Sequence, residues 1–124
     1  MAFFNRRNFV GVIVTLPAAN TNYNILALTN EILAAETGTA DKMECPGAAR
    51  NVQIQSYPGI DGIGANTNDI LIGDGKLSTT RAGAILSPGG FLSDRSPLDN
   101  VTFGEYYARS AGTNQKLLIM ISAG

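Results

Sequence analysis

The residue types that most often perform catalysis are missing or isolated in this sequence. The chain of 124 residues has no histidine, which removes the commonest general base, metal ligand and pH-sensitive group. A catalytic triad that depends on histidine is therefore impossible. The single cysteine, Cys45, has no histidine to activate it and precedes Pro46 and Gly47, so we interpret it as a loop residue. We predict that the protein is not an enzyme.

Two loop segments contain residues that occur in ligand sites. The segment Gly73-Asp-Gly-Lys-Leu-Ser78 has the residue types of a phosphate-binding loop, but it lacks the required spacing and no helix is expected after it. A calcium-binding EF-hand would need a glutamate where Ile72 stands. Turn chemistry explains the oxygen-bearing side chains of the preceding loop equally well. These are Asp61, Asn66, Asn68 and Asp69. We expect no metal site and no cofactor.

Other polar pairs have ordinary explanations. Asn100-Val-Thr102 is a glycosylation sequon, which matters only in a secreted eukaryotic protein. Asp94 and Arg95 could form an ion pair across a loop, but exposed pairs contribute little stability. Tyr106 and Tyr107 are adjacent in an expected strand and point to opposite faces, so they cannot form one sugar-stacking platform. We expect one of them in the core and the other at an interface.

The composition favours a protein that is covered by something else. Charged residues make up 15% of the chain, below the roughly 25% of an average domain, and the net charge is −1. Such a charge provides no field that would attract nucleic acid or an anionic membrane, and no apolar run approaches the ~20 residues of a membrane span. A surface with so few charges is poorly protected against self-association.

Short alternating segments between turn signals predict a mostly β protein. Residues 9–16 alternate with valines and a leucine on one face, residues 50–57 alternate around Val52 and Ile54, and Asn24 is placed to cap a short helix to Ala35. The unbroken apolar run 117–121 predicts a central strand covered on both faces. Further short strands are expected at 69–72, 84–86, 91–92, 101–103 and 105–109.

These elements predict an antiparallel β-sandwich, jelly-roll-like, with one short helix. We divide the chain into an N-terminal arm, residues 1–8, and a single sandwich domain, residues 9–124. Arg6-Arg7-Asn8-Phe9 and the apolar residues after it also fit a twin-arginine export signal. The apolar run is short for such a signal, so an arm leading into a first strand is the favoured interpretation.

From Asn22 to the C-terminus, the order of signals resembles the small β-sandwich structural proteins of tailed bacteriophage virions. The segments that carry this resemblance are Asn22-Tyr-Asn-Ile-Leu-Ala-Leu28, Ala49-Arg-Asn-Val-Gln-Ile-Gln-Ser56, Asp69-Ile-Leu-Ile-Gly-Asp-Gly75, Ile85-Leu-Ser-Pro-Gly-Gly90 and Gly112-Thr-Asn-Gln-Lys-Leu-Leu-Ile119. All of them are fold signals, and none is specific for an active site. The resemblance implies a capsid decoration (cement) or auxiliary head protein at the capsid surface, which binds the major capsid protein or other virion proteins.

The arm is the expected partner-binding segment. Phe3, Phe4 and Phe9 can be buried as anchors, and Arg6 and Arg7 can pair with carboxylates on the shell. The arm could equally pack on its own domain as a local strand. We expect a homo-oligomer, with a trimer as one option. A tail, neck or fibre component and a carbohydrate-binding or exported bacterial module remain as alternatives.

Overall fold

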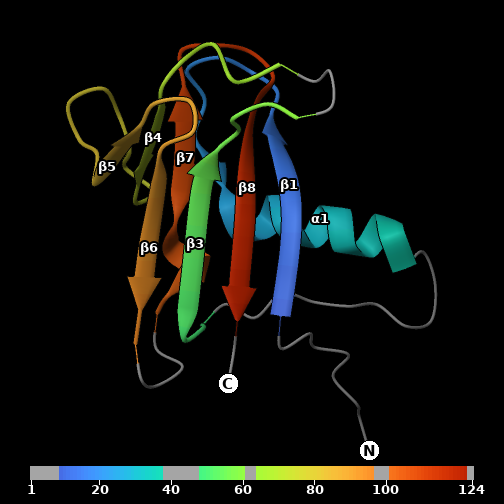
Figure 1. Ribbon diagram of the computed structural model, residues 1–124. Coiled ribbons are helices and arrows are strands. Elements are labelled where there is room, and N and C mark those ends of the chain that lie inside the picture. Colours follow the sequence, from blue (N-terminus) through green and yellow to red (C-terminus); the bar gives the residue numbers. More distant parts are fainter. Residues whose placement is uncertain (1–8, 38–47, 61–63, 97–100, 123–124) are drawn as a thin grey trace, which may run out of the picture.

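The computed structural model of the protein describes residues 9–37, 48–60, 64–96 and 101–122, which form two antiparallel sheets and one α-helix (Figure 1). The expected sandwich is therefore confirmed. The arm, residues 1–8, lies outside the described residues. The strands are β1 (Phe9–Leu16), β2 (Tyr23–Asn24), β3 (Asn51–Ser56), β4 (Ile70–Gly73), β5 (Ala84–Leu86), β6 (Phe91–Arg95), β7 (Tyr107–Ser110) and β8 (Gln115–Ser122). The helices are α1 (Ile25–Thr37) and the single 3₁₀ turn η1 (Phe103–Glu105).

The strand pairing is nested. One sheet has the order β1-β8-β3-β6 and the other has the order β2-β7-β4-β5. The first strand thus pairs with the last, the second with the seventh, the third with the sixth and the fourth with the fifth. A long antiparallel ribbon folded over into two layers has this connectivity, which is that of a jelly roll.

The core lies between the two sheets and is closed on one side by α1. The helix begins where the sequence predicts, because Asn24 Oδ1 accepts a hydrogen bond from the backbone N–H of Ala27 at 2.9 Å. Ile25, Thr29 and Leu33 repeat at intervals of four residues and are fully buried. The Thr29 hydroxyl donates to the Ile25 carbonyl at 2.9 Å, so its burial leaves no unsatisfied hydroxyl.

One expectation about the C-terminal third was wrong: residues 101–103 do not form a strand, because Val101 makes an isolated bridge with Ala49 and η1 follows. The strand expected at 105–109 is present as β7 with shifted bounds, Tyr107–Ser110. The turn places Phe103 in the core, where its ring packs against Tyr106 at a centroid distance of 6.1 Å. Burial of this large side chain outweighs the weak local preference for strand.

The run 117–121 is central but is not covered on both faces. It lies in β8, between β1 and β3, and Leu117, Ile119 and Ile121 are buried. Leu118 is half-buried, and Met120 is 42% exposed. An apolar run does not distinguish a strand covered on two faces from one whose second face is left apolar and open.

A buried amide joins the loop before β4 to the last strand. Asn66 is 8% exposed, and its Nδ2 donates to the Lys116 carbonyl at 2.7 Å and to Ser56 Oγ at 2.9 Å. Its Oδ1 accepts from the Lys116 backbone N–H at 2.7 Å. One side chain therefore satisfies both backbone groups of Lys116.

Replacing this amide should destabilise the fold. Asn66→Ala leaves the Lys116 N–H without a partner, while the Lys116 carbonyl keeps the hydrogen bond from the Tyr57 N–H, so we expect the free energy of unfolding to fall by about 1–3 kcal/mol. Thr79→Ala, at an exposed loop position, is the matched control and should change it by less than about 0.5 kcal/mol. Urea unfolding of both variants measures this, and equal midpoints would show that the amide is dispensable.

Candidate functional site

The residues predicted to bind a partner fall mostly outside the described part of the chain. Phe3, Phe4, Arg6 and Arg7 lie in residues 1–8, and Cys45 also lies outside. Phe9 is described: it is the first residue of β1 and is 60% exposed. Its ring is not part of the core.

The ligand-like loop residues have structural roles. Asp61 lies outside the described residues. The side chain of Asn66 already forms hydrogen bonds with Lys116 and Ser56. Across the described ranges, no three histidine, cysteine or acidic side chains come together as metal ligands. In the glycine-rich segment, Asp74 Oδ1 accepts from the Lys76 N–H at 2.9 Å and Asp74 Oδ2 pairs with Arg81 at 2.6 Å. The carboxylate of Asp74 thus has a local structural role in this turn.

The two tyrosines point to opposite faces, as predicted. Tyr106 packs against the core and donates a short hydrogen bond to the carboxylate of Asp94 on β6, so Asp94 is not paired with the Arg95 side chain. Tyr107 lies on the outer side of the second sheet, where an added Cβ at Gly75 would be 3.5 Å from its ring. Tyr107 is therefore covered by a loop of its own chain.

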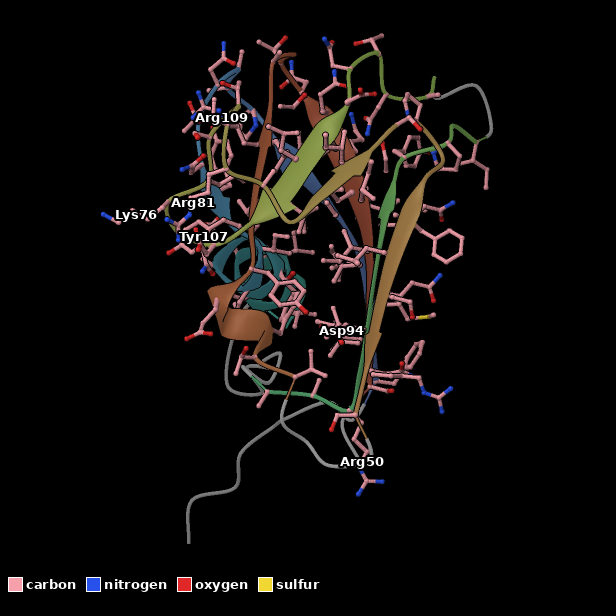
Figure 2. All side chains as sticks on the ribbon, turned by 90° about the vertical axis from the view of Figure 1, so that its left-hand side faces the viewer. Arg50, Lys76, Arg81, Asp94, Tyr107 and Arg109 are labelled. Carbon is pink, nitrogen blue, oxygen red and sulfur yellow. The ribbon has the colours of Figure 1, made fainter. Side chains whose placement is uncertain are left out.

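The outer surfaces of the two sheets differ. Over β2-β7-β4-β5, the loop of residues 74–83 folds back, so that Leu77 is only 2% exposed and its carbonyl accepts from Asn22 Nδ2 at 2.9 Å. Figure 2 shows the basic side chains of Lys76, Arg81 and Arg109 gathered on this side with Tyr107. Within the described residues, no comparable loop covers the outer surface of the other sheet.

We call this open surface the outer face. The strand registers place its side chains in four rows across β1-β8-β3-β6. The rows are Phe9, Ser122, Asn51 and Arg95; Gly11, Met120, Gln53 and Ser93; Ile13, Leu118, Gln55 and Phe91; and Thr15 with Lys116. Every intervening residue of β1, β8 and β3 points to the core side.

The outer face is apolar and lacks acidic groups. It contains four of the six large hydrophobic side chains that are exposed in the described residues: Phe9 60%, Ile13 45%, Phe91 63% and Met120 42%. No aspartate or glutamate stands at any of its positions, and its two cations, Arg95 and Lys116, lie at opposite ends. Neutral amides fill much of the remainder. An apolar surface of this kind, with a neutral polar surround, is typical of a binding site.

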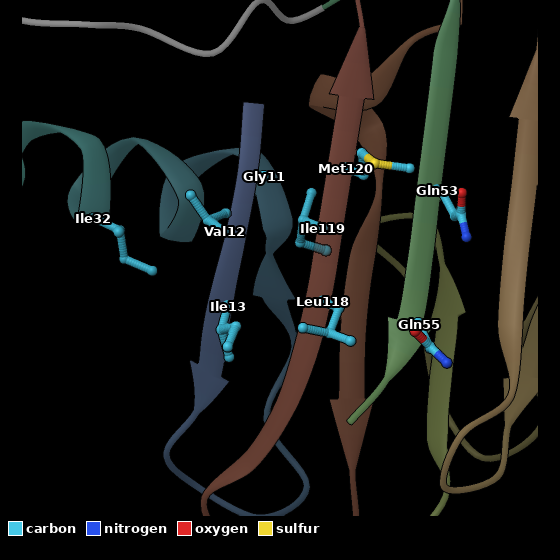
Figure 3. A pocket seen from close by; sticks show the side chains of 9 residues that line it. All are labelled: Gly11, Val12, Ile13, Ile32, Gln53, Gln55, Leu118, Ile119 and Met120. Atoms are coloured by element: carbon cyan, nitrogen blue, oxygen red, sulfur yellow. The ribbon is translucent and has the colours of Figure 1, made fainter. Parts of the chain in front are cut away.

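A shallow hollow of about 520 Å³ opens on this face beside Gly11 (Figure 3). Its lining consists of Gly11, Val12, Ile13, Ile32, Gln53, Gln55, Leu118, Ile119 and Met120. Gly11 has no side chain, and an added Cβ there would meet nothing closer than the Phe9 ring at 3.9 Å. The lack of a side chain at Gly11 thus leaves space at this end of the hollow.

The outer face can bind but has no groups for catalysis. Its hydroxyls, such as those of Ser93 and Ser122, have no general base beside them among the described residues. Burial of a half-exposed phenylalanine, methionine or isoleucine contributes on the order of 1–2 kcal/mol, and four such side chains are present on this face. Amides can form new hydrogen bonds with a partner at small net cost, whereas a carboxylate would have to be desolvated.

Compared with family models, with curated proteins and with solved structures, the chain gave no match. No helix of the described residues is long and apolar enough to cross a membrane.

The outer face was not predicted from the sequence, although a signal for it exists. In β1, Phe9 and Ile13 stand at positions that alternate with the core-facing ones. In β8, Leu118 and Met120 stand at such positions. Apolar residues at both sets of positions can indicate a strand buried on two faces or one with an exposed apolar face. The arrangement of the layers decides between them.

Neighbouring residues of β8 should show the difference between the two faces. Ile119→Ala removes a side chain that is 2% exposed, and we expect a loss of about 2–5 kcal/mol in the free energy of unfolding. Met120→Ala, at the exposed position beside it, should cost less than about 1 kcal/mol. Chemical unfolding of both variants is the measurement. Equal losses would mean that the outer face is buried in the isolated protein.

The pKa of Tyr106 gives a prediction at alkaline pH. Burial, and then the hydrogen bond to Asp94, raise this pKa well above the ordinary value of 10.0. The folded protein therefore keeps the Tyr106 proton to a higher pH than the unfolded chain. The contribution of Tyr106 to the free energy of unfolding should be fully present below about pH 10 and should be lost as the pH rises further. Tyr106→Phe should reduce that fall, which urea unfolding at a series of alkaline pH values measures. An unchanged dependence would show that Tyr106 is not the group responsible.

Proposed function

We propose that this protein is a structural component of a bacteriophage virion, a decoration or cement protein that binds the assembled capsid through its outer face. The observation that carries the proposal is the open apolar surface, free of acidic groups, on one sheet of a jelly roll. The major capsid protein is the proposed partner, and the capsid surface is the proposed location.

The fold is compatible with this role but does not decide it. Jelly rolls occur in viral capsid proteins, in lectins and in cupins, so the function has to be argued from the site. Cupin-type metal catalysis has no support, because the chain contains no histidine. Viral and sugar-binding roles remain, and both would use an open sheet face.

A role in binding the capsid shell would explain the low charge content of the chain. An isolated domain with exposed Phe9, Phe91 and Met120 is prone to self-association, whereas the same side chains stabilise a complex once a partner covers them. A protein that binds only the assembled shell stabilises that state by mass action. A tail, neck or fibre position would use the same face on a different partner.

A second candidate is carbohydrate binding. Gln53 and Gln55 lie next to Met120 and Phe91 on the outer face, and amides beside an exposed aromatic ring are groups that can bind a sugar. A glycan array probed with the wild-type protein and with Phe91→Ser tests this idea. Specific binding that the substitution abolishes would favour it over the virion role.

The virion proposal can be tested with one matched pair of substitutions. Phe91→Glu places a carboxylate on the outer face, and Ile85→Glu places one at an equally exposed position on the other sheet: the two side chains are 63% and 66% exposed. Each purified variant is mixed with capsids from a phage that encodes the chain and from which its gene has been deleted. Occupancy is then measured after sedimentation.

We expect wild-type protein and Ile85→Glu to occupy assembled capsids and not unassembled subunits. Phe91→Glu should bind at least about tenfold more weakly, because its carboxylate would be desolvated without a partner. Binding to tails alone would support the tail alternative. Failure of the wild-type protein to bind any virion part would refute the proposal, and equal occupancy of both variants would refute the role of the outer face.

A further inference from the structure

The four edges of the two sheets are unequal. Three of them are short: β2 has two residues, β5 has three and β6 has five, the last including Asp94 and Arg95. β1 has eight residues, and among the described residues it pairs only with β8. Short or charged edges resist pairing with another chain, whereas a long apolar edge invites it.

β1 lacks the features that protect edge strands. Its eight consecutive residues pair with β8 in one continuous register, from Phe9 with Ser122 to Leu16 with Gln115, so no bulge interrupts it. Its sequence, FVGVIVTL, contains neither a charged residue nor a proline. No strand in the described part of the chain uses the other side of β1, which therefore carries a regular row of backbone donors and acceptors.

Apolar groups line both sides of this edge. On the core side, α1 crosses behind β1 and continues past it (Figure 1), and Ile32 of α1 lies with Val12 in the lining of the hollow. Val12 is the one core-facing residue of β1 that is not fully buried. On the other side, Gly11 and Ile13 open onto the outer face. A strand added here would therefore find an apolar contact for each of its two faces.

We propose that residues 1–8 of a second copy of this chain add to the free edge of β1 as an extra strand. In an extended segment, consecutive side chains point to opposite faces. Phe3 and Phe4 are consecutive. When one ring lies opposite Gly11, in the hollow, the other lies opposite a core-facing valine and beside Ile32. Eight extended residues span about 26 Å, which is enough to follow β1 along its length.

Charge complementarity supports the same occupant. β1 and α1 together contain no lysine or arginine, and α1 contains Glu31, which is exposed, and Glu36. Residues 1–8 contain Arg6 and Arg7 and no acid. In the proposed complex, the basic and apolar residues 1–8 thus lie along the apolar strand β1 and beside the acidic helix α1. Backbone pairing provides affinity, and the two rings fix the register.

A second copy fits better than the same chain. Folding back onto its own β1 would require residues 1–8 to make a tight hairpin at Arg7 and Asn8, which lacks the glycine that two-residue turns favour. An arm given to a neighbour is a head-to-tail contact. Such contacts repeat until a ring closes, so a small closed oligomer is the expected product.

Two variants separate the donor from the acceptor. The double substitution Phe3→Ser with Phe4→Ser removes the rings and leaves the edge intact. Gly11→Leu fills the hollow and leaves the arm intact, and the 3.9 Å clearance at Gly11 indicates that the fold accepts it. Gly64→Leu is the matched control, because nothing lies within 4 Å of an added Cβ there. Light scattering gives the mass of each full-length protein, and mixtures are measured in the same way.

We expect an oligomer for wild type and Gly64→Leu, and monomers for the two test variants. Mixing the test variants should give a one-to-one dimer, since one supplies the arm and the other the edge. A monomeric wild type, unchanged mass in either variant, or a mixture that remains monomeric would overturn the proposal. If the mixed variants stay monomeric and residues 1–8 are ordered, residues 1–8 pair with β1 of their own chain. The readout needs no capsid, so it is independent of the proposed virion role.

Discussion

The structure depends on the position of β8, which pairs with the first strand on one side and with β3 on the other. Its core-facing residues, Leu117, Ile119 and Ile121, are at most 2% exposed and meet residues from both neighbouring strands. The chain must therefore bring its last strand, Gln115–Ser122, between two strands from much earlier in the sequence. The strands between them pair in successively inner pairs, β2 with β7, β3 with β6 and β4 with β5, which completes the nested pairing of a jelly roll.

The same pairing produces the candidate site. Because strand side chains alternate, Leu118 and Met120 point outward while Ile119 points inward. The registers align Leu118 with Ile13 and Gln55, and Met120 with Gly11 and Gln53. The apolar character of the outer face is thus not required by the core. In the proposed function, a partner covers these exposed apolar side chains.

Both proposals use this sheet in different ways. The outer face offers side chains to a partner surface, whereas the free side of β1 offers backbone groups to a partner strand. The hollow beside Gly11 connects the two, since its lining includes Ile32 of α1 as well as Gln53 and Met120. An arm bound at β1 would extend the apolar surface and leave Phe91, on the opposite edge strand, free for the shell.

The sequence by itself determined the class of fold, the helix that begins after Asn24, the alternating strands 9–16 and 50–57, and the absence of histidine-dependent chemistry. These follow from local periodicity, capping and composition. It did not determine that residues 103–105 form a turn, because the burial of Phe103 depends on both sheets. Nor did it determine that Leu118 and Met120 are exposed or that β1 is an edge. Only the tertiary structure decided these points, because the exposure of a strand face and the partners of a strand depend on which distant segments pack beside it.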